Sequence, residues 1–266
     1  MRILLLTLAL LLPVAAHAQP QQQRAIKSED FTQTRPDSGK GTRKESHTYR
    51  PASKPLKRPI NKFSASTLKV GVTLWKVERG TSTKEIARRV ETDTKFREGE
   101  LLRLSIESPR PGYLYVIDRD WFNDDTAGKT NLIFPRRDDD NRLEPGKLIT
   151  IPAESKTPFK TSPAPNQVGE MLTIIVTDSP LSLPLSDDVL PISDAQLAEW
   201  KRRWSGSTER FEMIGGAGQV RSMEEEVASE GSRQLTRDDP PPQTIYFLTP
   251  KSSAGLLFNL MLSYVK

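Results

Sequence analysis

Apolar and polar residues alternate through the middle of the chain with the period of two that is typical of β-strands. Leu102, Leu104 and Ile106 alternate with polar neighbours, which predicts a strand with one buried face. Residues 113–117 are apolar at every position, so this strand is expected to lie between two layers. Residues 118–125 break the pattern and are expected to form a loop, after which residues 131–134 resume a short strand.

Further strands are predicted on both sides of this stretch. Residues 81–90 fit either a short helical turn or the tip of a charged hairpin, and the pattern leaves both open. Apolar strands at the C-terminus need a sheet to pair with, so they are expected to return to the same domain. The set predicts a mainly β fold, an antiparallel β-sandwich-like domain over residues 68–266. The additional predicted strands are 68–77, 147–152, 171–177, 244–249 and 256–266.

One short helix is predicted in the C-terminal half of the chain. Ser193 and Gln196 have the spacing of a capping box, and the helix is expected to end near Trp204. Leu197, Trp200 and Trp204 form one apolar stripe, which favours core anchors over a ligand platform. Residues 206–243 are Gly-rich, then acidic, then Pro-rich, and are expected to form a long mobile loop. A division into two domains near Leu185 stays open.

The first 18 residues have the pattern of a secretory signal peptide. Arg2 precedes an apolar run over residues 3–12, and an A-x-A site ends at Ala18, which predicts cleavage between Ala18 and Gln19. Ten apolar residues are too few to span a membrane, which takes about 20. The chain has no cysteine, so it forms no disulfide and carries no lipidated cysteine. The mature protein is expected to be periplasmic or secreted.

Residues 19–67 are expected to be a disordered basic arm, rich in Gln, Pro and Ser and with few, aperiodic apolar residues. The arm has eleven Lys and Arg against four Asp and Glu, a net charge of +7, whereas residues 68–266 carry −3. The alkaline isoelectric point of 9.3 therefore comes from the arm. Such an arm is a solvated spacer or makes weak electrostatic contact with an anionic surface.

Four segments occur in an order that resembles a known family. They read FREGELLRLSIES, GYLYVIDRD, NLIFPRRDDDNRLEPGKLITIP and GEMLTIIVTDSPL. This order is similar to the bacterial domain-of-unknown-function family 4384, and the resemblance covers residues 68–184. It implies an exported β-rich accessory domain and carries over no functional residues. The late Gly128 and the bulky insertion around Trp121 and Phe122 depart from the family's loop pattern.

The residue types limit the chemistry of the folded part. Residues 68–266 contain neither histidine nor cysteine, which excludes Ser-His-Asp, Cys-His and His-ligated metal chemistry there. The remaining candidate is a Ca²⁺ site on the acidic loop, since hard cations bind clustered carboxylates, although the EF-hand spacing fails at Phe122. The alternative is a solvated polar loop. The candidate ligands are Asp118, Asp120, Asp124 and Asp125.

Three other patterns are weaker. Residues 138–140 are an acidic run that is typical of a solvated face. Glu107 with Asp118 is an example of a carboxylate pair for glycoside cleavage, which would need a cleft and a suitable separation. Residues 215–218 are Gly-rich but lack the Lys-Ser/Thr of a phosphate loop, which favours a flexible linker. No catalytic residue and no cofactor is predicted.

These observations lead to one main functional hypothesis and two alternatives. The main hypothesis is an exported, non-enzymatic accessory or binding module of the bacterial cell envelope that contacts a protein or an envelope polymer. The alternatives are a carboxylate-dependent enzyme acting on a cell-wall or surface glycan, and a structural envelope component. A concave site holding two acids would favour the enzyme. Neither a nucleic-acid partner nor a transmembrane segment is expected.

Overall fold

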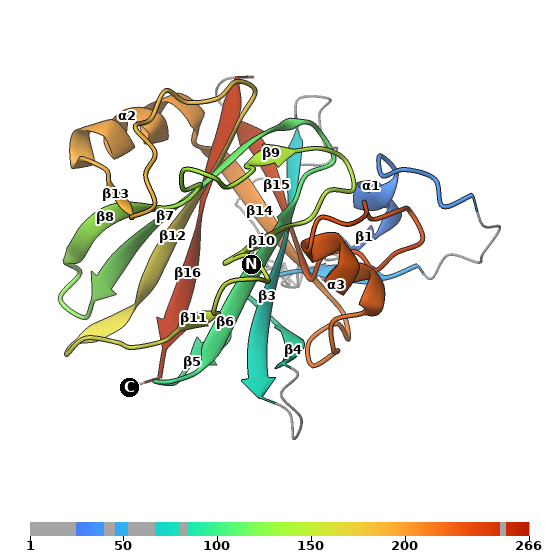
Figure 1. Ribbon diagram of the computed structural model, residues 1–266, viewed down its shortest axis with the longest axis horizontal. Coiled ribbons are helices and arrows are strands. Elements are labelled where there is room, and N and C mark those ends of the chain that lie inside the picture. The colour runs from blue at the N-terminus through green and yellow to red at the C-terminus, as the bar shows by residue number, and fades with distance from the viewer. Residues whose placement is uncertain (1–24, 40–45, 53–66, 80–84, 251–253, 266) are drawn as a thin grey trace, which may run out of the picture.

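The computed structural model describes residues 25–39, 46–52, 67–79, 85–250 and 254–265. Two β-sheets pack face to face with short helices around them (Figure 1). All strand pairs are antiparallel except the short pair of β16 with β5 among the named strands. The mainly β, antiparallel sandwich predicted from the sequence is confirmed.

The first sheet runs through the N-terminal and C-terminal parts of the chain. Its path is β1 (Ile26–Lys27), β2 (Thr48–Pro51), β14 (Gly206–Met213), β15 (Thr244–Pro250), β3 (Leu68–Arg79), β6 (Leu101–Glu107) and β10 (Ile149–Ile151). Two further strands join its sides: β4 (Glu85–Val90) pairs with β3, and β11 (Phe159–Lys160) pairs with β6. Within residues 81–90, the described part is therefore a hairpin strand and not a helical turn.

The second sheet holds the central strand of the family pattern. Its path is β13 (Leu190–Pro191), β8 (Ala127–Phe134), β7 (Gly112–Phe122), β12 (Gln167–Thr177), β16 (Gly255–Tyr264) and β5 (Lys95–Phe96), with β9 (Arg142–Leu143) paired to β7. β16 pairs with β12 over nine residue pairs, so the C-terminal strand returns to the sheet as predicted. The chain after residue 185 thus contributes strands to both sheets.

The main core lies between the two sheets because alternate residues of each strand point inward. On β3 these are Val70, Val72 and Leu74, and on the facing β7 they are Leu114 and Val116. All five side chains are almost completely buried. Further residues of this core include Leu102, Leu104, Ile106, Leu172, Ile174, Val176, Leu256, Phe258, Leu260, Leu262 and Tyr264.

Helix α2 (Asp194–Trp204) covers the outer face of the second sheet (Figure 1). The Ser193 side chain accepts a hydrogen bond from the Gln196 backbone N–H, which confirms Ser193 as the N-cap. Leu197, Trp200 and Trp204 are buried against the outward side chains of β7, β12 and β16, as the apolar stripe predicts. None of the described helices is long and apolar enough to cross a membrane.

The prediction of a disordered arm over residues 19–67 is wrong for residues 25–39 and 46–52. β1 and β2 extend the first sheet beyond β14, with helix α1 (Glu29–Thr32) between them in the chain. Ile26, Phe31 and Tyr49 are buried against β14 and β15. These apolar residues show no period because the elements are only two to four residues long. Apart from Thr67, the rest of the arm lies outside the described residues, as does the signal peptide.

Residues 206–243 are folded as well, which corrects the prediction of a long mobile loop. β14 begins this stretch, and helix α3 (Met223–Ser229) follows with a capping box formed by Ser222 and Glu225. The acidic run that suggested a solvated loop is the first turn of this helix, where acids interact favourably with the helix dipole.

Two buried arginines fix the Pro-rich segment that follows α3. Arg35 donates to Glu107 and to the carbonyl oxygens of Thr236, Asp239 and Pro240. Arg89 pairs with Glu225 and donates to the carbonyl oxygen of Pro241 at 2.8 Å. These charge-assisted bonds satisfy carbonyl groups of a segment without regular structure, so it is ordered by contacts distant in the sequence.

Candidate functional site

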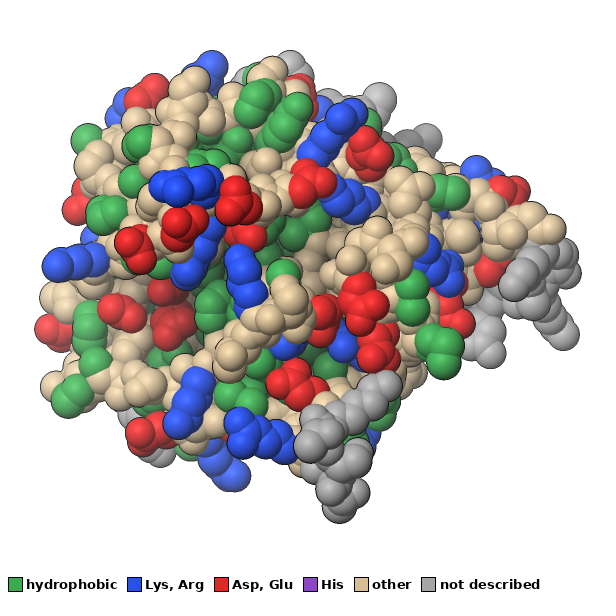
Figure 2. All heavy atoms as spheres, viewed as in Figure 1, with side chains coloured by type: hydrophobic (Ala, Val, Ile, Leu, Met, Phe, Trp, Pro, Cys, Tyr) green, Lys and Arg blue, Asp and Glu red, His purple; other side chains and the backbone are tan. Residues whose placement is uncertain are grey.

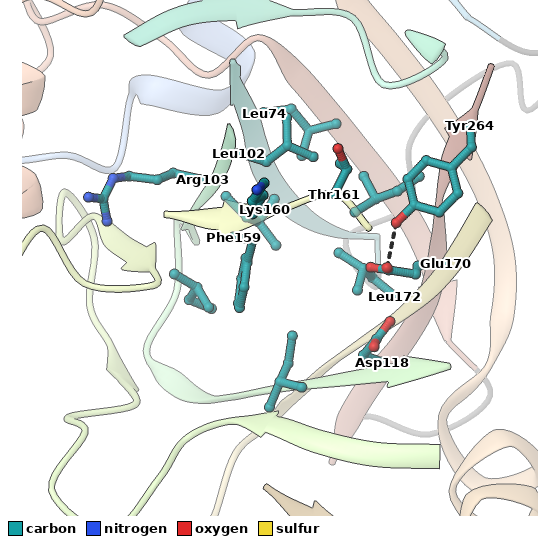
Figure 3. Close-up of a pocket in the computed structure, with 14 residues that line it drawn as sticks. Leu74, Leu102, Arg103, Asp118, Phe159, Lys160, Thr161, Glu170, Leu172 and Tyr264 are labelled. Carbon is teal, nitrogen blue, oxygen red and sulfur yellow. Dashed lines mark hydrogen bonds between the residues drawn. The ribbon is translucent and has the colours of Figure 1, made fainter. Parts of the chain in front are cut away.

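A pocket opens between the two sheets near the C-terminal end of β16 (Figure 3). Its volume is about 200 Å³. One side is acidic and hydrogen-bonding, and the rest is mainly aliphatic. The residues that line it are Leu74, Leu102, Arg103, Leu104, Asp118, Ile133, Ile151, Phe159, Lys160, Thr161, Glu170, Leu172, Leu262 and Tyr264.

The acidic side is a continuation of the inward face of the second sheet. On β7, Asp118 follows Leu114 and Val116 in the inward phase, and on β12 Glu170 precedes Leu172 in the same phase. β12 lies between β7 and β16, so these strands bring Asp118, Glu170 and Tyr264 together. Figure 3 shows the two carboxyl groups pointing toward one another with the Tyr264 hydroxyl beside them.

The hydrogen bonds of this group leave one acceptor unused. The Tyr264 hydroxyl donates to Glu170 Oε1. Asp118 Oδ1 is buried and has no hydrogen-bond partner among the described residues. A buried acceptor without a donor destabilises the folded state, and such an atom facing a pocket is a candidate ligand contact.

Burial and the neighbouring acids shift the ionisation of the group. Burial, reinforced by the charges of Glu170 and Asp120, raises the pKa of Asp118 to about 7. Burial is also the main cause of the raised pKa of Glu170, with Asp120 adding to it and the Tyr264 hydrogen bond opposing it. The pKa of Tyr264 is raised by burial and by Glu170, so its hydroxyl stays protonated as a donor.

Asp120 supports this group from the next inward position of β7. It accepts a hydrogen bond of 2.8 Å from Gln167 Nε2 and lies directly opposite Glu170 in the sheet register. A Cβ atom at Gly128 would approach Asp120 Oδ2 to 2.8 Å, so a glycine there leaves room for the carboxylate. The glycine that departs from the family pattern therefore has a local packing role.

The opposite side of the pocket is covered by β11. The Thr161 backbone N–H donates to Glu100 O at 2.9 Å, and the Gly99 N–H donates to Thr161 O at 2.8 Å, which ties this strand to the turn before β6. Phe159 stands at the rim with 39% of its surface exposed, and Lys160 is also exposed. The Arg103 guanidinium points away from the pocket (Figure 3) and donates to backbone carbonyls of residues 152, 153 and 156.

Among the described residues, the three fully buried acids each have an arginine partner, which sets the pocket apart; Glu212 lies 3.8 Å from Arg210 Nε. Glu107 pairs with Arg35, and Glu225 pairs with Arg89. No described lysine or arginine side chain pairs with Asp118 or Glu170. The pocket therefore presents negative charge and unused acceptor capacity beside an aliphatic wall, which suits a ligand that has a donor or cationic group on an apolar body.

The four candidate Ca²⁺ ligands are not brought together among the described residues. Asp118 and Asp120 belong to strand β7 and not to a loop as the sequence suggested, and of the two only Asp118 lines the pocket. Asp124 accepts hydrogen bonds from the Thr126 N–H and hydroxyl in the hairpin turn, and these bonds lower its pKa. Asp125 is exposed in the same turn with φ of 60°. The described residues contain no group of three or more His, Cys, Asp or Glu side chains that could hold a metal ion.

The remaining sequence candidates are structural. In the acidic run, Asp139 pairs with Lys156 and Asp140 pairs with Lys147 on the surface. Glu107 and Asp118 do not form the carboxylate pair suggested for glycoside cleavage. Glu107 is buried on the first sheet against Arg35, whereas Asp118 faces the pocket from the second sheet. The Gly-rich residues 215–218 form a turn, in which the Gly218 N–H donates to Arg89 O.

Glu170 and Tyr264 are the site residues that sequence reasoning missed. The alternation of the strand could have identified Glu170, because it lies two residues before Leu172 and four before Ile174 and so faces the core with them. An acid in the inward phase of a strand is unusual because its desolvation is costly, and it marks either an internal ion pair or a site.

The surface around the pocket offers no comparable charge pattern. Figure 2 shows that basic and acidic side chains are interspersed over the face viewed there and do not gather into large patches of one sign. Interspersed charges are typical of a solvated surface. On this face, the pocket is therefore the stronger candidate for a functional site.

Comparison with known proteins identifies the family of the central part of the chain. Residues 95–180 match the model of a family described as "Domain of unknown function (DUF4384)". This match confirms the resemblance drawn from the sequence over the matched residues. The matched part contains Asp118 and Glu170 but not Tyr264. Searches of curated proteins and of solved structures found no match.

Proposed function

We propose that this protein is an exported accessory binding module of the bacterial cell envelope. In this proposal the pocket between the sheets holds a group of a partner protein or envelope polymer. The observation that carries it is a partly aliphatic pocket with Asp118 Oδ1 buried at its wall and without a partner among the described residues. The signal-peptide pattern ending at Ala18 supports export.

The basic N-terminal region supplies a secondary, salt-sensitive attraction to anionic surfaces in this proposal. Not all of its cations are available for such contact. Arg35 is buried with Glu107, and Arg50 pairs with Glu91. Lys and Arg residues at 24, 40, 43, 44, 54, 57, 58 and 62 lie outside the described residues. Each cation near an anionic surface contributes about 1 kcal/mol at best, so this attraction supplements the pocket and does not replace it.

A second candidate function is a carboxylate-dependent enzyme acting on a cell-wall or surface glycan. The observation that favours it is the concave site with two acids, Asp118 and Glu170. A carboxyl with a pKa of about 7 is suited to general acid or base catalysis near neutral pH. The pocket lining favours the binding module, because the walls beside the acids are mainly aliphatic.

Site-specific crosslinking in intact envelopes tests the binding module. A photo-crosslinking residue at Phe159 stands at the rim of the pocket, and the same residue at Met223, which is 75% exposed on α3, is the control. We expect a discrete adduct at Phe159 that Asp118→Asn weakens, and none at Met223. Equal labelling at both positions, or labelling that ignores Asp118→Asn, would contradict the proposal.

Two further measurements separate the alternatives. Mass spectrometry of the mature protein from envelopes should give an N-terminus at Gln19, and a chain retaining Met1 would contradict export with cleavage. The wild-type protein should release no more soluble fragments from isolated cell wall than the Asp118→Asn and Glu170→Gln variants do. Fragment release that both substitutions abolish would instead establish the enzyme.

A further inference from the structure

We propose that the pocket binds an aliphatic ammonium group, the lysine side chain of a partner polypeptide, with Asp118 and Glu170 as its anionic partners. This inference rests on the proposed binding function and names the ligand chemistry of the same pocket. Three features of the pocket support it: the uncompensated charge of the acids, the aliphatic wall, and the absence of a metal-type ligand set among the described residues.

The charge of the pocket is complementary to a cation from outside the chain. Elsewhere in the fold, Glu107 and Glu225 are buried together with arginines that neutralise them. Asp118 and Glu170 are next to Asp120, which adds negative charge, and no described lysine or arginine side chain pairs with either of them. A buried carboxylate is stabilised strongly by a charge-assisted hydrogen bond. A cationic ligand would therefore stabilise Asp118 and Glu170 in the way that the arginines stabilise Glu107 and Glu225.

The aliphatic wall fits the stem of a lysine side chain. Leu102, Leu172 and Leu262 line the pocket beside the acids. A lysine has four methylene groups, which pack along apolar surface while the ammonium reaches a polar end. The exposed Phe159 at the rim offers further apolar surface where the stem enters. A small hydrated cation would gain nothing from these walls.

The acceptor set suits an ammonium better than a metal ion or a guanidinium. The described residues contain no group of three or more acidic or other metal-ligating side chains, whereas Ca²⁺ takes six to eight oxygens. An ammonium has three donors on one compact centre. Asp118 Oδ1 is free to accept one of them, and Glu170 has a second oxygen beside the one that Tyr264 occupies. A planar guanidinium with five donors would leave several of them unsatisfied.

Binding of such a cation should depend on pH because the ligand pairs with ionised Asp118. The titratable and charged groups around Asp118 are Glu170 on β12, Asp120 on β7, Tyr264 on β16 and, across the pocket on β11, Lys160. With the pKa of Asp118 at about 7, its ionised fraction rises about tenfold between pH 6 and pH 8. Affinity should rise by a similar factor over this range.

The test uses the mature full-length protein and N-acetyl-lysine N-methylamide as the probe, with binding followed by NMR chemical-shift changes. A probe of this size is expected to bind with a Kd of about 1 mM. N-acetyl-norleucine N-methylamide has the same stem length without the charge and should bind at least about tenfold more weakly. Asp118→Asn should weaken the lysine probe by a similar factor and remove the pH dependence. Glu170→Gln should weaken it as well.

Asp125→Asn is the matched control, since it removes one negative charge from the exposed turn of the same hairpin and leaves the pocket unchanged. Thermal melting verifies that each variant folds. Equal binding of the lysine and norleucine probes, tighter binding of the arginine analogue, or equal effects of Asp118→Asn and Asp125→Asn would each overturn the ammonium assignment. The crosslink at Phe159 would survive those outcomes if the pocket binds another group, whereas loss of the crosslink contradicts the proposed function itself.

Discussion

Replacement of Asp118 by asparagine should stabilise the protein at alkaline pH and have little effect at acidic pH. The substitution keeps the shape of the side chain and removes the charge that the pocket disfavours. A carboxyl group whose pKa is raised in the folded state stays protonated there at pH values at which the unfolded chain has already released the proton. The wild-type protein therefore loses stability as pH rises from the ordinary pKa of 3.8 to the folded value of about 7.

The size of the effect follows from the two pKa values. Each pH unit between them removes about 1.4 kcal/mol of unfolding free energy, so the interval from pH 5 to pH 7 removes about 3 kcal/mol. The Asp118 side chain keeps partial contact with solvent, which screens its interactions and reduces this figure. We expect the advantage of Asp118→Asn over the wild type to grow by about 2 kcal/mol between pH 5 and pH 8.

Urea denaturation followed by tryptophan fluorescence at pH 5, 6, 7 and 8 measures this difference directly. The wild type, Asp118→Asn and the control Asp125→Asn should be compared in the absence of ligand. Charge changes shared by the three proteins cancel in the comparison. If the stability difference between Asp118→Asn and the wild type stays constant across this range, Asp118 is not a desolvated acid in the pocket.

Two further predictions concern the elements that hold the fold together. Arg35→Ala leaves Glu107 buried without a cation and should cost about 3–5 kcal/mol of unfolding free energy, measured in urea. Arg50→Ala breaks an exposed ion pair and should cost less than about 1 kcal/mol. Equal effects of the two substitutions would mean that residues 25–39 do not dock on the sheet. Trp204→Ala should cost about 3–5 kcal/mol of unfolding free energy because this side chain is buried between α2 and the second sheet. Arg202→Ala on the same helix should change stability by less than about 0.5 kcal/mol. A small loss of stability for Trp204→Ala would refute the packing of α2.

The parts of the fold that were predictable are those whose signal is local. Alternation identified the strands of the family segment, and the stripe of Leu197, Trp200 and Trp204 identified α2, because each pattern depends on neighbours within one element. The N-terminal segment gave no such signal. Tyr49 is buried against β14 and β15, and its hydroxyl donates to Pro242 O, 193 residues away in the chain. A contact of this separation leaves no period in a segment of four residues.

The candidate site was half predictable for a similar reason. Asp118 and Asp120 were recognised as acids of interest but were assigned to a loop, since acids within a strand break the apolar pattern. The strand continues to Phe122 because its backbone pairs with both β8 and β12, and backbone pairing does not depend on side-chain polarity. The contribution of β16 could not be anticipated, because Tyr264 reaches Glu170 only through the pairing of strands distant in sequence.

An inward-facing acid lowers the stability of a strand, and this chain offsets that cost in two different ways. At Glu107 and Glu225 the compensating cation is internal, which fixes distant segments in one arrangement. At Asp118, no described side chain supplies the cation. In our proposal an external ammonium supplies it, and its binding would offset the free energy that ionisation of Asp118 costs the folded protein. The pH dependence of stability and that of affinity would then share one origin, the raised pKa of Asp118 in the folded protein.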